Sequence, residues 1–201
     1  MESMGPRGFQ LVLLRRMADY RPQLVDDARR ELGATRAEMR EANRRWQAML
    51  RSARAPSGLR RYRLLLGPAE TTARRPVGDL DCEVHRWPVP LWPDLRYEVV
   101  TLEGGPVLHE WLVRAEGATA PRPRHVGELD PWSCVVDDVA RAFAPAVPME
   151  GTAPSRWRLA FTAPDASGRS GRHVAEFTWG LLQRVVPAHA EPGRAQEEAG
   201  G

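Results

Sequence analysis

A carboxylate and an imidazole stand where a β-hairpin would place them side by side. Residues around Gly104-Gly105 alternate between apolar and polar types, which predicts two strands, 96–103 and 106–114, joined by a tight turn. Such a hairpin places Glu98 and His109 diagonally opposite each other on one face of the sheet. A carboxylate in contact with an imidazole can carry out general acid–base catalysis. Glu98 and His109 are therefore the candidate catalytic residues if the protein is an enzyme.

The same pair has an alternative interpretation that involves no catalysis. Cross-strand pairs of Glu and His are common on solvated sheet faces, and a register shift of one residue would exchange the two faces. An enzyme would need a concave pocket around His109, whereas a flat, solvated face would exclude it. The predicted faces are Glu98, Val100, His109 and Trp111 on one side, and Tyr97, Val99, Leu108, Glu110 and Leu112 on the other.

Metal, cofactor and nucleophile motifs are incomplete or missing. Cys82 and His85 have the spacing of half a zinc site, but Cys134 stands alone and no second pair follows. Cys134 lies in an apolar segment, so we predict a place in the core. The sequence contains no GxSxG, no phosphate-binding loop, no GxGxxG and no HExxH. We therefore expect no bound metal and no cofactor.

A stripe of basic side chains follows one face of a helix predicted from Thr35 to about Arg54. Thr35 and Glu38 form a capping box at its start, and Pro56 ends it. Apolar side chains, among them Trp46, occupy a separate arc. A basic stripe beside a packed apolar face suits a helix that lies along phosphates. The candidate nucleic-acid-binding residues are Arg36, Arg40, Arg44, Gln47, Arg51 and Arg54, followed by Arg60 and Arg61.

The segment before this helix resembles the turn of a helix-turn-helix motif. It reads Leu32-Gly33-Ala34-Thr35, with a glycine that ends one helix and a threonine that caps the next. The resemblance covers about twenty residues and departs at Arg29, where the motif has a small residue. It implies that Arg36, Arg40 and Arg44 make the contacts nearest the helix N-terminus, while the later arginines hold the backbone.

The charge of the chain is divided along its length. Residues 1–63 hold fifteen Arg and seven acidic residues, a net charge of +8, whereas residues 64–201 have a net charge of −5. The chain contains no Lys and no Ile, a composition typical of a GC-rich bacterial genome. Arginine is well suited to phosphate and carboxylate because its planar guanidinium donates up to five hydrogen bonds. The acidic remainder is itself an anion that could cover the arginine stripe.

The periodicity predicts an α+β fold, with an N-terminal helical hairpin of two to three helices followed by a mostly antiparallel sheet with one or two helices. A helix is expected to begin at Asp130-Pro131 and to include Trp132. Residues 145–155 read as a linker. The predicted strands are 61–66, 81–87, 96–103, 106–114, 156–162 and 172–179, the last with a short helical turn after it. The predicted units are a basic helical unit at 1–55, an α+β body at 56–186 and a disordered tail at 187–201.

These observations favour a cytoplasmic protein that binds nucleic acid, or another polyanion such as an acidic protein surface, through the arginine-lined helix. The body would then serve for dimerisation or sensing, with a homodimer as one arrangement. The apolar run at 11–14 is too short for a signal peptide or a membrane span. One alternative is a small accessory enzyme or ligand-binding protein with its site near Glu98 and His109. Another is a protein–protein adaptor, which would need the face of Met39, Trp46 and Leu50 to be uncovered.

Overall fold

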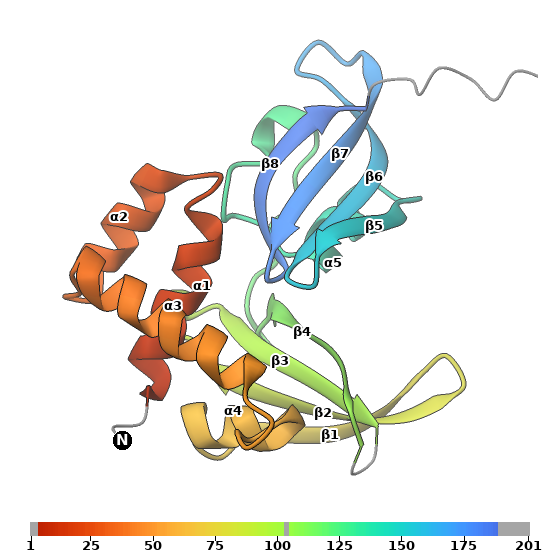
Figure 1. Ribbon diagram of the computed structural model, residues 1–201. Coiled ribbons are helices and arrows are strands. Elements are labelled where there is room, and N and C mark those ends of the chain that lie inside the picture. Colours follow the sequence, from red (N-terminus) through yellow and green to blue (C-terminus); the bar gives the residue numbers. More distant parts are fainter. Residues whose placement is uncertain (1–3, 103–104, 189–201) are drawn as a thin grey trace, which may run out of the picture.

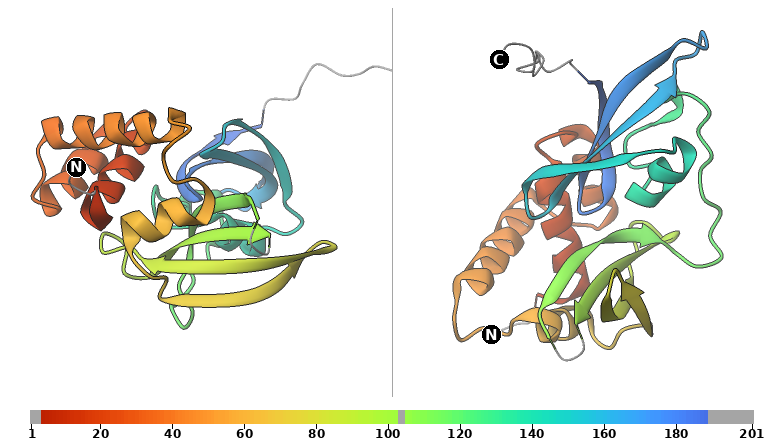
Figure 2. Two further views of the ribbon diagram at one scale, coloured as in Figure 1. Left: turned by 60° about the horizontal axis from the view of Figure 1, so that its bottom comes forward. Right: turned by 90° about the vertical axis from the view of Figure 1, so that its right-hand side faces the viewer.

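The computed structural model describes residues 4–102 and 105–188, which form a helical layer followed by two four-stranded antiparallel sheets. The predicted α+β class is confirmed, although the strands divide into two sheets instead of forming one. Figure 1 shows the helices packed beside both sheets, and Figure 2 shows the two sheets as separate layers. None of the helices in these ranges combines the length and the apolar character needed to cross a bilayer.

Helix α1 is the centre of the helical layer. Its residues Phe9 to Leu14 are all buried, and α3 packs mainly on α1, with α2 and α4 also in contact with it. Pro22 begins α2 as predicted, and Gly33 takes a φ of +59° in the turn before α3. The capping box predicted at Thr35 is present. The four helices are α1 (Gly5–Met17), α2 (Pro22–Glu31), α3 (Arg36–Arg51) and α4 (Gly58–Leu66).

The strand predicted at 61–66 is wrong, because this segment is part of helix α4. The alternation that suggested a strand places Leu64 on the same side as Tyr62. In the helix Tyr62 is fully buried and Leu64 is 57% exposed. Leu65, three residues after Tyr62, is the second buried side chain, which is the helical spacing. Gly67, with a φ of +82°, ends the helix.

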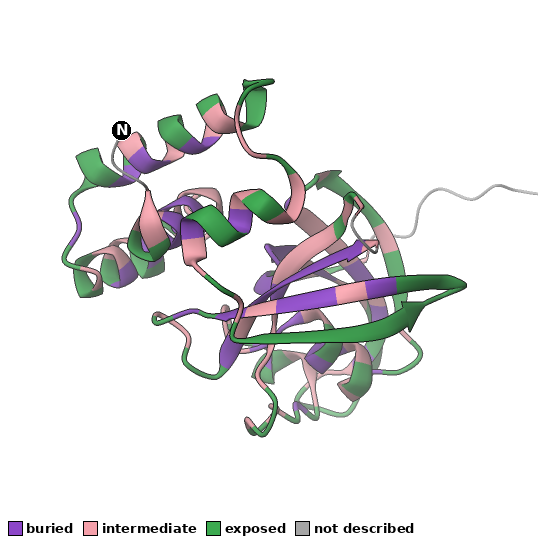
Figure 3. Ribbon diagram, turned by 90° about the horizontal axis from the view of Figure 1, so that it is seen from below, coloured by how far each residue is buried: buried purple, intermediate pink, exposed green. Residues whose placement is uncertain are grey.

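The first sheet is a meander in which each strand pairs with the next. The predicted strand at 81–87 and the hairpin around residue 104 are confirmed as β2, β3 and β4. Val100 pairs with His109 and Glu98 pairs with Trp111, as the predicted register requires, and a bulge follows Val100. The strands are β1 (Thr71–Val77), β2 (Leu80–Pro88), β3 (Leu95–Leu102) and β4 (Val107–Arg114), and β1 is exposed along its whole length (Figure 3).

The second sheet corrects three expectations. The linker predicted at 145–155 contains strand β5, and the short helical turn expected after residue 179 is strand β8. The helix expected from Asp130 begins six residues later, because Val135 is bridged to Leu181 and Trp132 has a φ of +67°. These elements are the 3₁₀ turn Val126–Glu128, α5 (Val136–Ala142), β5 (Val147–Ala153), β6 (Arg156–Pro164), β7 (Ser170–Thr178) and β8 (Leu181–Pro187).

An aromatic cluster joins the helices to both sheets. Phe9 of α1 packs edge-on against Trp46 of α3 at 5.6 Å and Tyr97 of β3 at 4.8 Å between ring centroids. Trp179, between β7 and β8, completes the cluster at 6.4 Å from Trp46. Burial of several aromatic rings in one cluster stabilises the fold strongly. A second core lies between α5 and the second sheet, where Phe143 is among the buried residues.

The turn between β7 and β8 touches the backbone of β4. The backbone N–H of Leu112 donates a hydrogen bond to the Trp179 carbonyl at 2.7 Å. Gly180 has a φ of +78°, and a Cβ at this position would stand 2.8 Å from the Leu112 carbonyl oxygen and 2.9 Å from Trp111 Cβ. Only glycine fits both the backbone conformation and the close approach. Of the predicted tail at 187–201, only Pro187, which ends β8, and Ala188 fall within the described residues.

Candidate functional site

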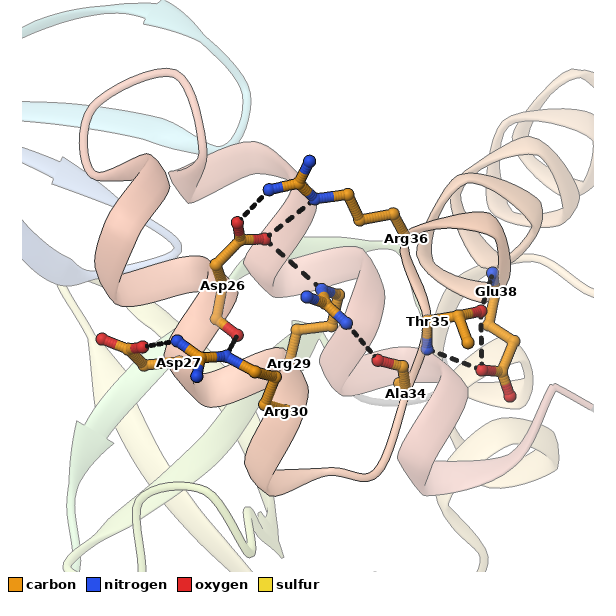
Figure 4. Close-up of polar contacts among 8 residues, drawn as sticks. All are labelled: Asp26, Asp27, Arg29, Arg30, Ala34, Thr35, Arg36 and Glu38. Carbon is orange, nitrogen blue, oxygen red and sulfur yellow. Dashed lines mark hydrogen bonds and ion pairs between the residues drawn. The ribbon is translucent and has the colours of Figure 1, made fainter.

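The start of α3 is fixed by charge-assisted hydrogen bonds. The Thr35 backbone N–H donates to the Glu38 carboxylate at 2.7 Å, and the Glu38 N–H donates to Thr35 Oγ1 at 3.1 Å (Figure 4). Arg7 of α1 donates to the same carboxylate at 3.1 Å. The hydrogen bonds from the Thr35 backbone and side chain and from Arg7 lower the pKa of Glu38 to about 2. The first turn of α3 is therefore firmly positioned at neutral pH.

Hydrogen bonds and ion pairs of two arginines, Arg29 and Arg36, stabilise the turn before α3. The Arg29 guanidinium donates to the Ala34 carbonyl and to Asp26, so the residue that departs from the helix-turn-helix pattern bridges the turn. Arg36 forms an ion pair with the same Asp26 of α2 (Figure 4). The guanidinium of Arg36 is thus already engaged by a carboxylate, although its side chain is exposed. The resemblance to a helix-turn-helix motif therefore depends only on the residue types of the turn, Leu32-Gly33-Ala34-Thr35.

The remaining arginines of the predicted stripe face solvent. Arg40, Arg44, Arg51 and Arg54 are exposed, and Gln47 is half-buried. Neither sheet covers them, since α3 packs on α1 through its apolar face. Glu41 of the same helix pairs with Arg44. Within 4–102 and 105–188, Arg40, Arg51, Arg54 and Arg60 form no ion pair with an acidic residue.

The open positive charge therefore lies toward the C-terminal half of α3 and in α4. Residues 42–69 contain seven Arg and no Asp or Glu. Arg60 is exposed. Arg61 is half-buried, with its guanidinium carbon 5.6 Å from the centroid of the Trp46 ring and its Nε donating to the Pro56 carbonyl at 3.2 Å. We define the basic surface as five exposed arginines of α3, of α4 and of the segment between them, namely Arg40, Arg44, Arg51, Arg54 and Arg60.

The apolar face of α3 is mostly covered by the chain itself. Met39 is 8% exposed and Trp46 is 2% exposed, whereas Leu50 is 44% exposed. An adaptor that binds partners through this face would need all three side chains to be accessible. The packing of Met39 and Trp46 on the helical core leaves only Leu50 for such a contact.

Glu98 and His109 lie together on the face of the first sheet that is turned away from the N-terminal helices. His109 Nε2 lies 3.7 Å from Glu98 Oε1, and the Glu98 side chain is almost fully buried. Arg86 Nε donates to Glu98 Oε2 at 2.8 Å, and Arg75 donates to Oε1 at 3.2 Å. Burial opposes ionisation, but the nearby His109, the hydrogen bond from Arg86 and the charges of Arg86 and Arg75 lower the pKa of Glu98. A carboxylate surrounded in this way is a poor general base.

A cavity of about 480 Å³ adjoins Glu98. It is lined by residues of the first sheet, by the segment after β4 and by α5. Glu98 and Trp111 of the predicted face line it, whereas His109 does not. The lining also includes Arg75, Arg86, Arg114 and Arg141, which sequence reasoning did not select. Cross-strand pairing of Arg86 with Glu98 was the only signal that could have identified one of them.

The opposite face of the sheet carries a second acidic residue, the half-buried Glu110. Glu110 accepts a hydrogen bond from Tyr62 of α4, and burial raises the pKa of Glu110. It lines a cavity of about 710 Å³ at the start of α4, together with Arg60 and Arg61. Glu110 was predicted to lie on an apolar face of the hairpin, without a functional role. Burial also raises the pKa of Tyr62 well above its usual range.

Cys82 and His85, which have the spacing of half a zinc site, do not come together in the structure. Cys82 and His85 are three residues apart on β2, so their side chains leave opposite faces of the strand. Cys82 is buried with Val84 and Val100, and His85 hydrogen-bonds Thr72 at 3.2 Å. In the described part of the chain, no group of three or more His, Cys, Asp or Glu side chains could hold a metal ion.

Comparison with known proteins identifies no family. No family model matches the chain, and no curated protein matches it by sequence. One solved structure, that of a proposed beta-lactamase inhibitor protein from Streptococcus mutans, aligns with a TM-score of 0.28 and 8% identity. The alignment covers 70% of this chain and 88% of that protein. A similarity this low carries no functional inference, so function must be argued from the residues themselves.

Proposed function

We propose that this protein binds nucleic acid in the cytoplasm through the basic surface of α3 and α4. The observation that supports the proposal is the exposure of Arg40, Arg51, Arg54 and Arg60, which have no acidic partner among the described residues. The last three lie in the stretch 42–69, which contains no Asp or Glu. Within 64–102 and 105–188, no acidic side chain forms an ion pair with Arg40, Arg44, Arg51, Arg54 or Arg60. Exposed arginines of this kind favour phosphate because each contact releases a condensed counterion.

The length of α3 suits a phosphate backbone. Its sixteen residues span about 24 Å at about 1.5 Å per residue. One DNA strand has a phosphate about every 3.4 Å along the helix axis, so α3 can follow about seven phosphates. Arg40, Arg51 and Arg54 have no competing carboxylate and should contribute most. Arg36 should contribute less than its position near the N-terminus suggests, because Asp26 already neutralises it.

The experiment measures binding of a fluorescein-labelled 20-base-pair duplex, and of single-stranded RNA of the same length, by anisotropy across a series of salt concentrations. The test variant carries Arg40→Ala, Arg51→Ala and Arg54→Ala. The control variant carries Arg122→Ala, Arg169→Ala and Arg172→Ala, which removes three exposed arginines elsewhere. Loss of three phosphate contacts should reduce the slope of log K against log salt by about 2.7 for the duplex.

Equal effects of the test and control variants would contradict the proposal, as would the absence of any binding by the native protein at low salt. A preference for RNA or for duplex DNA identifies which nucleic acid is bound. On this proposal the two sheets serve for dimerisation or sensing, and light scattering of the purified protein tests for a homodimer.

A further inference from the structure

The cavity beside Glu98 is built on the face of the first sheet that is remote from α4. Strands β1, β2 and β3 contribute Arg75, Arg86 and Glu98, and β4 contributes Trp111 and Arg114. Helix α5 and the segment at 115–120 form the remaining walls. A volume of about 480 Å³ lies within the range of pockets that hold small molecules. This site is separate from the basic surface and does not depend on the proposed function.

Two buried carboxylates hold the four arginines in place. Glu98, whose side chain is 2% exposed, binds Arg75 and Arg86. Asp138 of α5, whose side chain is 0% exposed, binds Arg114 at 2.6 Å and Arg141 at 3.4 Å. Each carboxylate therefore fixes one pair of guanidinium groups. Arginines positioned in advance lose little conformational entropy when they bind an anion.

Two residues of the cavity wall carry hydrogen-bond donors that have no partner among the described residues. The buried Nε of Arg114 and Nε1 of Trp111 have no hydrogen-bond partner in the described part of the chain. Buried donors are rarely left unpaired, because an unpaired donor loses its interaction with water. Both residues line the cavity, but the two nitrogen atoms are themselves buried, so an acceptor oxygen would reach them only after a side-chain movement. This distinguishes the site from an arginine cluster that is already fully paired.

Charge and apolar surface define the chemistry of the ligand. Four arginines face Glu98, Asp137 and Asp138, which leaves one positive charge in excess. The Trp111 ring and the side chain of Val113 supply apolar surface in the same cavity. Such a combination recognises a molecule with an anionic head and an apolar body.

We propose that this cavity binds a small organic anion, a carboxylate or phosphate ester, whose oxygens accept hydrogen bonds from the arginines. The apolar part of the molecule packs against Trp111 and Val113. Glu98 acts in this site by positioning Arg75 and Arg86, and it does not act as a general base.

The experiment titrates the full-length protein with benzoate, phenyl phosphate and inorganic phosphate by isothermal calorimetry. The test variant is the double substitution Arg75→Gln and Arg141→Gln. These side chains are 47% and 67% exposed, and Glu98 keeps Arg86 while Asp138 keeps Arg114. The variant should therefore fold, which circular dichroism and thermal unfolding will verify. The control is Arg169→Gln with Arg172→Gln, on exposed residues outside the cavity.

The native protein and the control should bind benzoate or phenyl phosphate, with the folded test variant at least about tenfold weaker, a difference of about 1.4 kcal/mol. Phenyl phosphate should bind more tightly than inorganic phosphate because only the former contacts Trp111. The proposal is overturned if none of the three probes binds the native protein with a Kd below about 1 mM. It is also overturned if the test variant binds as tightly as the control, or if inorganic phosphate binds as tightly as the tighter of benzoate and phenyl phosphate. The tighter of benzoate and phenyl phosphate identifies the head group.

Discussion

Two energetic costs of replacing Gly180 by alanine can be measured separately. One is the cost of a left-handed backbone conformation, and the other is the steric overlap of the added Cβ with β4. Gly180 has a φ of +78°, and an added Cβ would lie 2.8 Å from the Leu112 carbonyl oxygen. Gly168, at the turn between β6 and β7, has a φ of +86° with no atom within 4 Å of an added Cβ. The two glycines thus share the backbone conformation and differ in the space around them. Gly168→Ala is therefore a matched control for Gly180→Ala.

The expected magnitudes follow from these contacts. Alanine in a left-handed conformation costs about 1–2 kcal/mol, which is the whole effect expected for Gly168→Ala. Gly180→Ala adds an overlap with rigid backbone atoms, at about 1–3 kcal/mol. Moving the turn away also breaks the hydrogen bond from the Leu112 N–H to the Trp179 carbonyl, which costs about 0.5–1.5 kcal/mol. Gly180→Ala should therefore destabilise the protein by at least about 1.5 kcal/mol more than Gly168→Ala.

Urea denaturation followed by tryptophan fluorescence and by far-ultraviolet circular dichroism measures both free energies of unfolding. Coincident transitions by the two signals establish that the comparison is valid. Equal losses for the two variants, within about 0.5 kcal/mol, would refute the reasoning, since the overlap at Gly180 would then have no energetic consequence.

Two further predictions concern the acidic residues Glu110 and Asp138. The raised pKa of Glu110 means that its ionisation destabilises the fold increasingly as the pH rises from its unfolded value through its folded value. Glu110→Gln can still accept the Tyr62 hydrogen bond. It should raise the free energy of unfolding at about pH 8 and change it little near pH 4. Denaturation curves that shift equally at both pH values would contradict this prediction. Asp138→Asn should destabilise by about 3–5 kcal/mol, because it leaves Arg114 partly buried without a countercharge. Arg141→Ala, which removes only the exposed partner, should cost no more than about 1 kcal/mol in the same thermal or urea measurement, and similar losses for the two variants would argue against a buried pair.

Local patterns predicted the elements whose periodicity has a single interpretation. The capping box at Thr35 and the alternation around residue 104 lead directly to α3 and to the β3–β4 hairpin. In 61–66 the apolar residues fit both periods, and burial of Tyr62 and Leu65 against the helices decided for a helix. Strand β5 was missed because its residues are mostly exposed and lack alternation.

The only part of the candidate site that could be predicted from the sequence is the part formed by a single hairpin. The proximity of Glu98 and His109 follows from the register of a single turn. Arg75 and Arg141 belong to β1 and α5, far apart in sequence, and only tertiary packing brings them to one cavity. Because a carboxylate with three basic neighbours behaves differently from a carboxylate with one, the missing arginines also changed the expected chemistry of Glu98.

The placement of Trp179 near the end of the described chain has a consequence for the order of folding. Every strand pairs only with its neighbours in sequence, so each sheet can form as its own segment is synthesised. The aromatic cluster around Trp46 is completed only when Trp179 arrives, more than sixty residues after the end of β4. At about 5–20 residues per second, this interval lasts about 3–13 s on the ribosome. During it the helices and the first sheet must persist with part of their shared core open to water.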